Sequence, residues 1–83
     1  MKLSFIIPCY NEVKTIQRAI EEVRSLQIEK EIIVIDNCST DGTREILKEM
    51  ESGDLQIVYQ ESNYGFGRSI QVGCSLVSGD FIY

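Results

Sequence analysis

Hydrophobic positions follow two alternating spacings along this chain. Short apolar runs, of the kind that form strands, occupy residues 3–7, 31–36, 55–60 and 80–83. Between these runs, apolar residues recur every three or four positions, as they do on one face of a helix. The three helical stripes are Val13, Ile16, Ala19, Ile20, Val23 and Leu26, then Ile46, Leu47 and Met50, then Ile70, Cys74 and Val77. The pattern predicts the element order β-α-β-α-β-α-β.

The apolar run at residues 32–35 identifies the centre of the sheet. Four consecutive aliphatic residues are too few for a typical helix and leave no polar face for solvent. They indicate a central parallel strand that is covered on both sides. Strands that alternate with helices predict right-handed crossovers and a parallel sheet with helices on both faces. The predicted fold class is therefore α/β, with a Rossmann-like, three-layer α/β/α arrangement.

Helix starts and glycines give local signals. Asn11 is predicted to be the N-cap of the first helix, with Glu12 in its first turn, and residues 39–41 are predicted to cap the second. Gly65 and Gly67 lack the third glycine of a dinucleotide fingerprint and the GK[ST] ending of a P-loop. We expect these two glycines to let the third helix approach the sheet closely.

Polar residues follow the first two strands directly. Asp36 and Asn37 end the buried second strand, and a regular strand would point their side chains to opposite sides of the sheet. Helix capping explains a carboxylate and an amide beside four buried aliphatics poorly, so we favour a ligand role for this pair. In a parallel sheet the end of the first strand lies beside them, and ligands bind at such an edge. There, Tyr10 offers a face for a nucleobase and Glu12 an acceptor for base or ribose donors.

Arg68 falls in the first turn of the third predicted helix. In that place an arginine either reaches a phosphate group of the ligand or is solvated, and the sequence favours neither.

The charge balance excludes one class of partner and restricts another. The chain has eight Lys and Arg residues, thirteen Asp and Glu residues, no histidine and a net charge of −5, and its basic residues form no patch. A nucleic-acid partner is therefore not expected. An anionic ligand would need backbone amides, a helix end or a bound divalent cation to hold it.

The cysteines and the start of the chain bear on its compartment. Cys9, Cys38 and Cys74 are far apart, odd in number and without a CxxC pair, so neither a disulfide framework nor a zinc site is indicated. The apolar start before Pro8 is too short for a signal-peptide core or a membrane span. We expect reduced thiols and a cytoplasmic protein.

Four motifs follow one another along the chain. They are Ser4-Phe5-Ile6-Ile7-Pro8-Cys9-Tyr10-Asn11-Glu12, Ile35-Asp36-Asn37-Cys38-Ser39-Thr40-Asp41-Gly42-Thr43, Asn63-Tyr64-Gly65-Phe66-Gly67 and Ser78-Gly79-Asp80-Phe81-Ile82. In order and in spacing, these motifs resemble family-two glycosyltransferases of the GT-A fold. Within that family, the chain resembles the branch that contains the dolichol-phosphate mannose synthases and bacterial polyprenyl-phosphate glycosyltransferases.

The resemblance implies a nucleotide site for a UDP- or GDP-sugar. By position, Pro8, Tyr10 and Glu12 would line the base and ribose pocket, completed by the Ile35 backbone and Asn37. Position 37 is commonly aspartate in that family, so the amide of Asn37 changes what a base would meet. Asp36 is expected to hold the turn and remains a secondary site candidate, as does Arg68.

The resemblance also implies functions that this sequence does not carry. The family's DxD-type motif follows the fourth strand, where it would bind Mg²⁺ or Mn²⁺, and the sequence given ends at Tyr83. We therefore expect residues 1–83 to be the nucleotide-binding half of a longer enzyme, lacking the metal-binding and acceptor half. This chain alone would bind no metal and hold no catalytic residue. The resemblance suggests that the parent enzyme lies at the cytoplasmic face of a membrane and that a membrane lipid phosphate, such as a polyprenyl phosphate, is one candidate acceptor.

Two other classes of function stay open from the residues alone. A receiver-like signalling module would use Asp36 as a phosphoacceptor, although a matching acidic pair and lysine are missing. A non-catalytic interaction module is the other, and the unpaired sheet edge would favour its self-association.

Overall fold

The computed structural model describes residues 2–53, 55–77 and 81–82 of the chain. Its elements are β1 (Leu3–Cys9), α1 (Ile16–Arg24), β2 (Lys30–Asp36), α2 (Thr43–Met50), β3 (Leu55–Tyr59), α3 (Phe66–Leu76) and β4 (Phe81–Ile82). The predicted order of strands and helices is confirmed. Of the predicted last strand, residues 80 and 83 lie outside the described residues.

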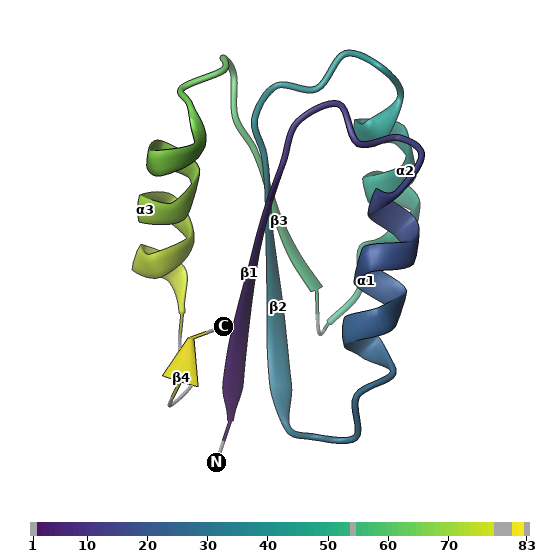
Figure 1. Ribbon diagram of the computed structural model, residues 1–83, viewed down its shortest axis with the longest axis vertical. Helices are drawn as coiled ribbons and strands as arrows, with labels where there is room; N and C mark the ends of the chain where they lie inside the picture. The colour runs from purple at the N-terminus through teal and green to yellow at the C-terminus, as the bar shows by residue number, and fades with distance from the viewer. Residues whose placement is uncertain (1, 54, 78–80, 83) are drawn as a thin grey trace.

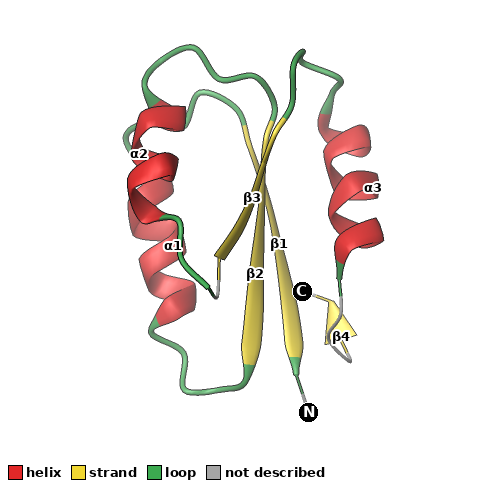
Figure 2. Cartoon of the chain, turned by 180° about the vertical axis from the view of Figure 1, so that it is seen from behind, coloured by secondary structure: helices red, strands yellow, loops and turns green. Residues whose placement is uncertain are grey.

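The four strands form one parallel sheet in the order β3-β2-β1-β4. Helices α1 and α2 cover one face of the sheet, and α3 covers the other (Figures 1 and 2). The chain therefore runs outward from β1 to β3 and then returns to the other side of β1. This arrangement confirms the Rossmann-like α/β/α fold, and the order of the strands reverses beside β1, which is where such folds bind ligands.

Strand β2 forms the centre of the molecule, as its apolar run predicts. Residues 32–35 are at most 1% exposed. Ile32 and Val34 pack in one core with Ile16 and Ile20 of α1 and Leu47 of α2. Because side chains alternate along a strand, the other two residues of the run face α3. The strand is covered on both sides.

Helix α3 approaches β1 most closely at Gly73. A Cβ atom placed on Gly73 would lie 2.5 Å from Cγ2 of Ile6, closer than real carbon atoms approach. A Cβ atom on Gly65 or Gly67 would meet nothing within 4 Å. The expectation that Gly65 and Gly67 permit the close approach is therefore wrong. Gly65 is needed for another reason, because its φ of 90° lies in a region that other residues rarely adopt.

The start of α1 also differs from the prediction. The helix begins at Ile16 with Thr15 as its N-cap, and Asn11 lies in the preceding loop with a φ of 52°. There Oδ1 of Asn11 accepts a hydrogen bond from the backbone N–H of Thr40 at 2.8 Å, and its own N–H donates to Oγ of Ser39 at 2.8 Å. Asn11 therefore bonds to the neighbouring loop instead of capping the helix. Its positive φ is one that asparagine adopts more readily than most residues.

The loop before α2 is bonded to the same neighbour. The N-cap of α2 is Gly42, with a φ of 103°, rather than one of residues 39–41. Asp41 lies one position earlier, and its Oδ1 accepts the N–H of Thr43 at 3.1 Å while its Oδ2 accepts the N–H of Val13 at 3.2 Å. Thr43 in turn accepts the N–H of Glu12 at 3.0 Å through Oγ1. The loops that follow β1 and β2 thus hold each other in place.

Candidate functional site

A pocket of about 350 Å³ lies at the carboxyl ends of β1 and β2. Its size falls within the range usual for small-molecule sites. The first three strands all deliver their following loops to this end of the sheet (Figure 1). The lining residues are Pro8, Cys9, Tyr10, Glu12, Asn37, Asn63, Gly65 and Ser69.

Asp36 and Asn37 point to opposite sides of the sheet, as the strand pattern predicts. The Asp36 carboxylate accepts a hydrogen bond and ion pair from Arg44 of α2. The Asn37 amide instead bonds to Asn63 and Tyr64 of the loop that leads to α3. Asn37 lines the pocket and Asp36 does not. Of the pair, Asn37 is therefore the residue that a ligand would meet.

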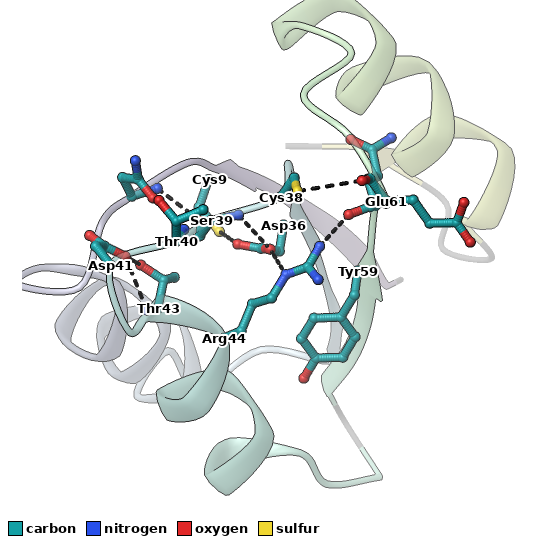
Figure 3. Close-up of polar contacts among 12 residues, drawn as sticks. Cys9, Asp36, Cys38, Ser39, Thr40, Asp41, Thr43, Arg44, Tyr59 and Glu61 are labelled. Atoms are coloured by element: carbon teal, nitrogen blue, oxygen red, sulfur yellow. Dashed lines mark hydrogen bonds and ion pairs between the residues drawn. The ribbon is translucent and has the colours of Figure 1, made fainter.

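Arg44 of α2 bonds to residues at the ends of both β2 and β3, on the face of the sheet that α1 and α2 cover. Its Nε donates to Oδ2 of Asp36, and another guanidinium nitrogen donates to the carbonyl oxygen of Gln60. Its guanidinium carbon lies 5.5 Å from the centre of the Tyr59 ring (Figure 3). Oδ2 of Asp36 also accepts the N–H of Ser39 at 3.1 Å. The carboxylate, which is 0% exposed, is thus fully compensated, and it raises the pKa of the Arg44 guanidinium.

Cys9 connects this buried pair to the pocket wall. Its Sγ donates to Oδ1 of Asp36 at 3.6 Å, and the residue is 6% exposed. Burial, and after it the negative charge of Asp36, raises the pKa of the Cys9 thiol to about 12. The thiol is therefore neutral at physiological pH and is neither a nucleophile nor a ready metal ligand there.

We expect Cys9 to resist alkylation in the folded protein while the other two thiols react. All three cysteines are free; Cys38 is partly exposed and Cys74 is exposed. Iodoacetamide labelling at pH 8, followed by peptide mass spectrometry, should modify Cys74 first and Cys9 only after denaturation. Labelling of native Cys9 at the rate of Cys74 would contradict the buried, neutral state.

Tyr10 and Glu12 line the pocket, and both residues are exposed to solvent. Tyr10 is 45% exposed, so part of its surface is accessible to a ligand. Oε2 of Glu12 accepts the hydroxyl of Thr15 at 2.9 Å. This bond orients the carboxylate, and no donor among the described residues bonds to its Oε1, which can accept an N–H or hydroxyl group.

Besides Asp36, two predicted site residues, Ile35 and Arg68, are absent from the pocket lining. For Ile35 the resemblance implies a role of the backbone; its side chain is 0% exposed, and the residue sits in the sheet between Pro8 of β1 and Val58 of β3. Arg68 stands 5.7 Å from the centre of the Tyr64 ring. The lining therefore brings together Pro8, Tyr10, Glu12 and Asn37, but neither Ile35 nor Arg68.

The sequence pattern does not identify several residues of the site. Cys9, Asn63 and Ser69 line the pocket, and Arg44 supports it from the other face of the sheet. The glycines and the family resemblance of the motif Asn63-Tyr64-Gly65 assign no role to Asn63 itself. An asparagine two residues before a glycine with positive φ is typical of a side chain that bonds to the turn, and this signal would have identified Asn63.

Burial argues against Asp36 as a phosphoacceptor. A phosphoacceptor carboxylate must reach a phosphate donor in solution. The Asp36 carboxylate is 0% exposed and already accepts hydrogen bonds from three donors in the protein. The receiver-like alternative is therefore not supported.

Metal ligands do not gather in the part of the chain that the structure describes. No group of three or more His, Cys, Asp or Glu side chains there is arranged to hold an ion. The donor set of this pocket thus does not fit a divalent metal by itself. None of the described helices is both long and apolar enough to cross a bilayer.

Comparison with protein families gives one match that spans the chain. The model described as glycosyl transferase family 2 matches residues 4–83. Among curated proteins, the poly-beta-1,6-N-acetyl-D-glucosamine synthase of Staphylococcus epidermidis is 37% identical over 82 residues. That of Staphylococcus aureus strain COL is 34% identical. Each alignment covers 96% of this chain and 20% of the relative, so the chain spans about a fifth of their length.

Solved structures of similar shape agree with this match. Residues 1–349 of S. aureus TarS superpose with a TM-score of 0.87 at 31% identity, over 99% of this chain and 26% of that one. TarS has also been solved with UDP and with UDP-GlcNAc. The mannosyltransferase PcManGT of Pyrobaculum calidifontis, in complex with GDP-Man and Mn²⁺, has a TM-score of 0.87 at 22% identity, over 96% of this chain and 25% of that one. The last similarity shows a shared fold.

Proposed function

Since this chain belongs to glycosyl transferase family 2, we propose that it forms the nucleotide-binding half of an enzyme that transfers a sugar from a nucleoside diphosphate donor. The observation that carries the proposal is the pocket at the ends of β1 and β2, lined by Pro8, Tyr10, Glu12 and Asn37. These are four of the five residues that the resemblance implies for the base and ribose.

The chemistry of the lining suits a nucleoside. The exposed Tyr10 ring can stack on a base, and stacking of this kind is worth about 1–3 kcal/mol per base. The free Oε1 of Glu12 can accept from a ribose hydroxyl or a base N–H. Asn37 brings an amide that both donates and accepts. The similar structure of TarS has been solved with UDP, and that of the mannosyltransferase PcManGT with GDP-Man. UDP and GDP are therefore the two nucleotides to test.

These residues would hold the nucleotide of the donor and would take no part in binding a metal. The metal and the acceptor, for which a membrane lipid phosphate such as a polyprenyl phosphate is our proposal, would be held by parts of the enzyme beyond these residues. The net charge of −5 repels a diphosphate, so we expect weak binding, with a Kd near about 1 mM.

Titration of the ¹⁵N-labelled chain with UDP and GDP, with and without Mn²⁺, tests the proposal. We expect NMR shift changes centred on the amides of Tyr10, Glu12 and Asn37. Tyr10→Ala should weaken binding by about 5- to 100-fold, because it removes the stacking surface. Ile28→Ala is the matched control, since Ile28 is equally exposed at 46% and lies outside this pocket. Unchanged spectra at 10 mM of both nucleotides would refute the proposal.

A further inference from the structure

The Asn37 side chain uses both of its polar ends within the protein. Nδ2 donates to Oδ1 of Asn63 at 2.5 Å, and Oδ1 accepts the backbone N–H of Tyr64 at 2.9 Å. Asn37 is 6% exposed whereas Asn63 and Tyr64 are exposed, so these bonds are partly buried. An amide has two donor hydrogens and two acceptor lone pairs. One of each therefore remains for a ligand.

Asn63 is fixed by a second backbone donor. Its Oδ1 accepts the N–H of Gly65 at 3.0 Å as well as the Asn37 amide, which uses both lone pairs of that oxygen. Two backbone N–H groups, those of Tyr64 and Gly65, thus decide which way each amide is turned. The side chains cannot flip independently without a lost bond.

We propose that Asn37 and Asn63 act as one positioning unit, an amide latch that holds residues 63–65 as a wall of the nucleotide pocket. The inference rests on the proposed function for the identity of the ligand. The latch joins the end of β2 to the loop before α3, and Gly65 is the N-cap of that helix. Asn37 therefore shapes the pocket through the loop as well as facing the ligand directly.

Aspartate substitutions distinguish the latch from two independent side chains. Asn63→Asp retains an acceptor for both Asn37 and Gly65, so both bonds persist. Asn37→Asp retains the acceptor for Tyr64, but its carboxylate faces Oδ1 of Asn63. Asn63 must then turn its nitrogen to position 37, and the N–H of Gly65 loses its acceptor. The double variant places two carboxylates together without a hydrogen between them, and the latch opens.

Amide hydrogen exchange of the four proteins tests the latch without any nucleotide. In Asn37→Asp, exchange at Gly65 should accelerate by about 2- to 10-fold, the value of one lost hydrogen bond, while Tyr64 changes less. In Asn63→Asp both amides should keep their protection. In the double variant, hydrogen exchange at the amides of Tyr64 and Gly65 should accelerate by more than the product of the accelerations in the two single variants. Equal acceleration of Gly65 in the two single variants would overturn the proposed orientation.

UDP affinity, measured on the same four proteins, tests what the latch does for binding. We expect the double variant to lose at least about threefold more affinity than the product of the two single losses. The pair Gln56→Glu and Gln71→Glu adds the same two charges at exposed positions outside the pocket, and its effects should multiply simply. Multiplicative losses at positions 37 and 63 would overturn the positioning role. If the wild-type chain binds no UDP, the proposed function fails, and the exchange data still decide whether the latch exists.

Discussion

Replacement of Arg44 by alanine is expected to lower the free energy of unfolding by about 3 kcal/mol. The change leaves the Asp36 carboxylate, which is 0% exposed, without its counter-charge, and the loss of one partner of a buried pair costs about 3–5 kcal/mol. The lower end of this range applies because the Arg44 side chain is 28% exposed. A chain of 83 residues has a total stability of only about 4–12 kcal/mol, so the urea midpoint should fall markedly.

Arg18→Ala is the matched control for this effect. Arg18 pairs with Glu22 on the surface of α1, and the two side chains are 86% and 70% exposed. Exposed pairs of this kind contribute about 0.3–0.5 kcal/mol. Asp36→Asn in the Arg44→Ala background should recover part of the loss, since it removes the buried charge. Equal urea midpoints for Arg44→Ala and Arg18→Ala would show that the Arg44 pair does not stabilise the strand ends.

The second large effect is expected at Gly73. Gly73→Val should destabilise the protein by about 2–3 kcal/mol, because its Cβ alone would lie 2.5 Å from Cγ2 of Ile6. Helix α3 must then move away from β1, and Ser69 of the pocket wall moves with it. We therefore expect nucleotide affinity to fall together with the thermal midpoint.

Two further variants separate crowding from helix propensity. Gly67→Val makes the same change in the same helix where nothing lies within 4 Å, and it should alter stability by less than about 0.5 kcal/mol. Ile6→Ala removes the crowding atom, so it should restore stability to Gly73→Val while destabilising the wild type. If Gly67→Val and Gly73→Val are equally destabilising, the close contact between α3 and β1 is not the cause.

The sequence predicts the parts of this fold that depend on local periodicity. The aliphatic residues 32–35 indicate a central strand, and β2 is buried on both faces. The alternation of side chains along that strand also predicts that Asp36 and Asn37 face opposite sides, as they do. Periods of two and of about 3.6 residues carry this information within a single element.

The sequence does not predict features that depend on which distant residues meet. Arg44 looks like a solvated residue of α2, and only the fold brings it to Asp36 and to the carbonyl of Gln60. Asn11 has the local features of a helix cap, yet a bond to Thr40 across two loops determines its position. Gly73 differs from Gly67 only in what α3 packs against. Tertiary contacts override local preferences at each of these residues.

The bonds between the two loops that follow β1 and β2 couple the local unfolding of these loops. Backbone donors at Asn11, Glu12 and Val13 end on side chains of Ser39, Thr43 and Asp41, which are 28 to 31 positions away. Neither loop satisfies these donors by itself, so an opening that releases one loop breaks the bonds of both. The two loops thus form a single cooperative unit of local unfolding. The contact between the loops therefore also holds Tyr10 and Glu12 of the pocket lining. These two residues are less mobile than they would be if each loop moved alone.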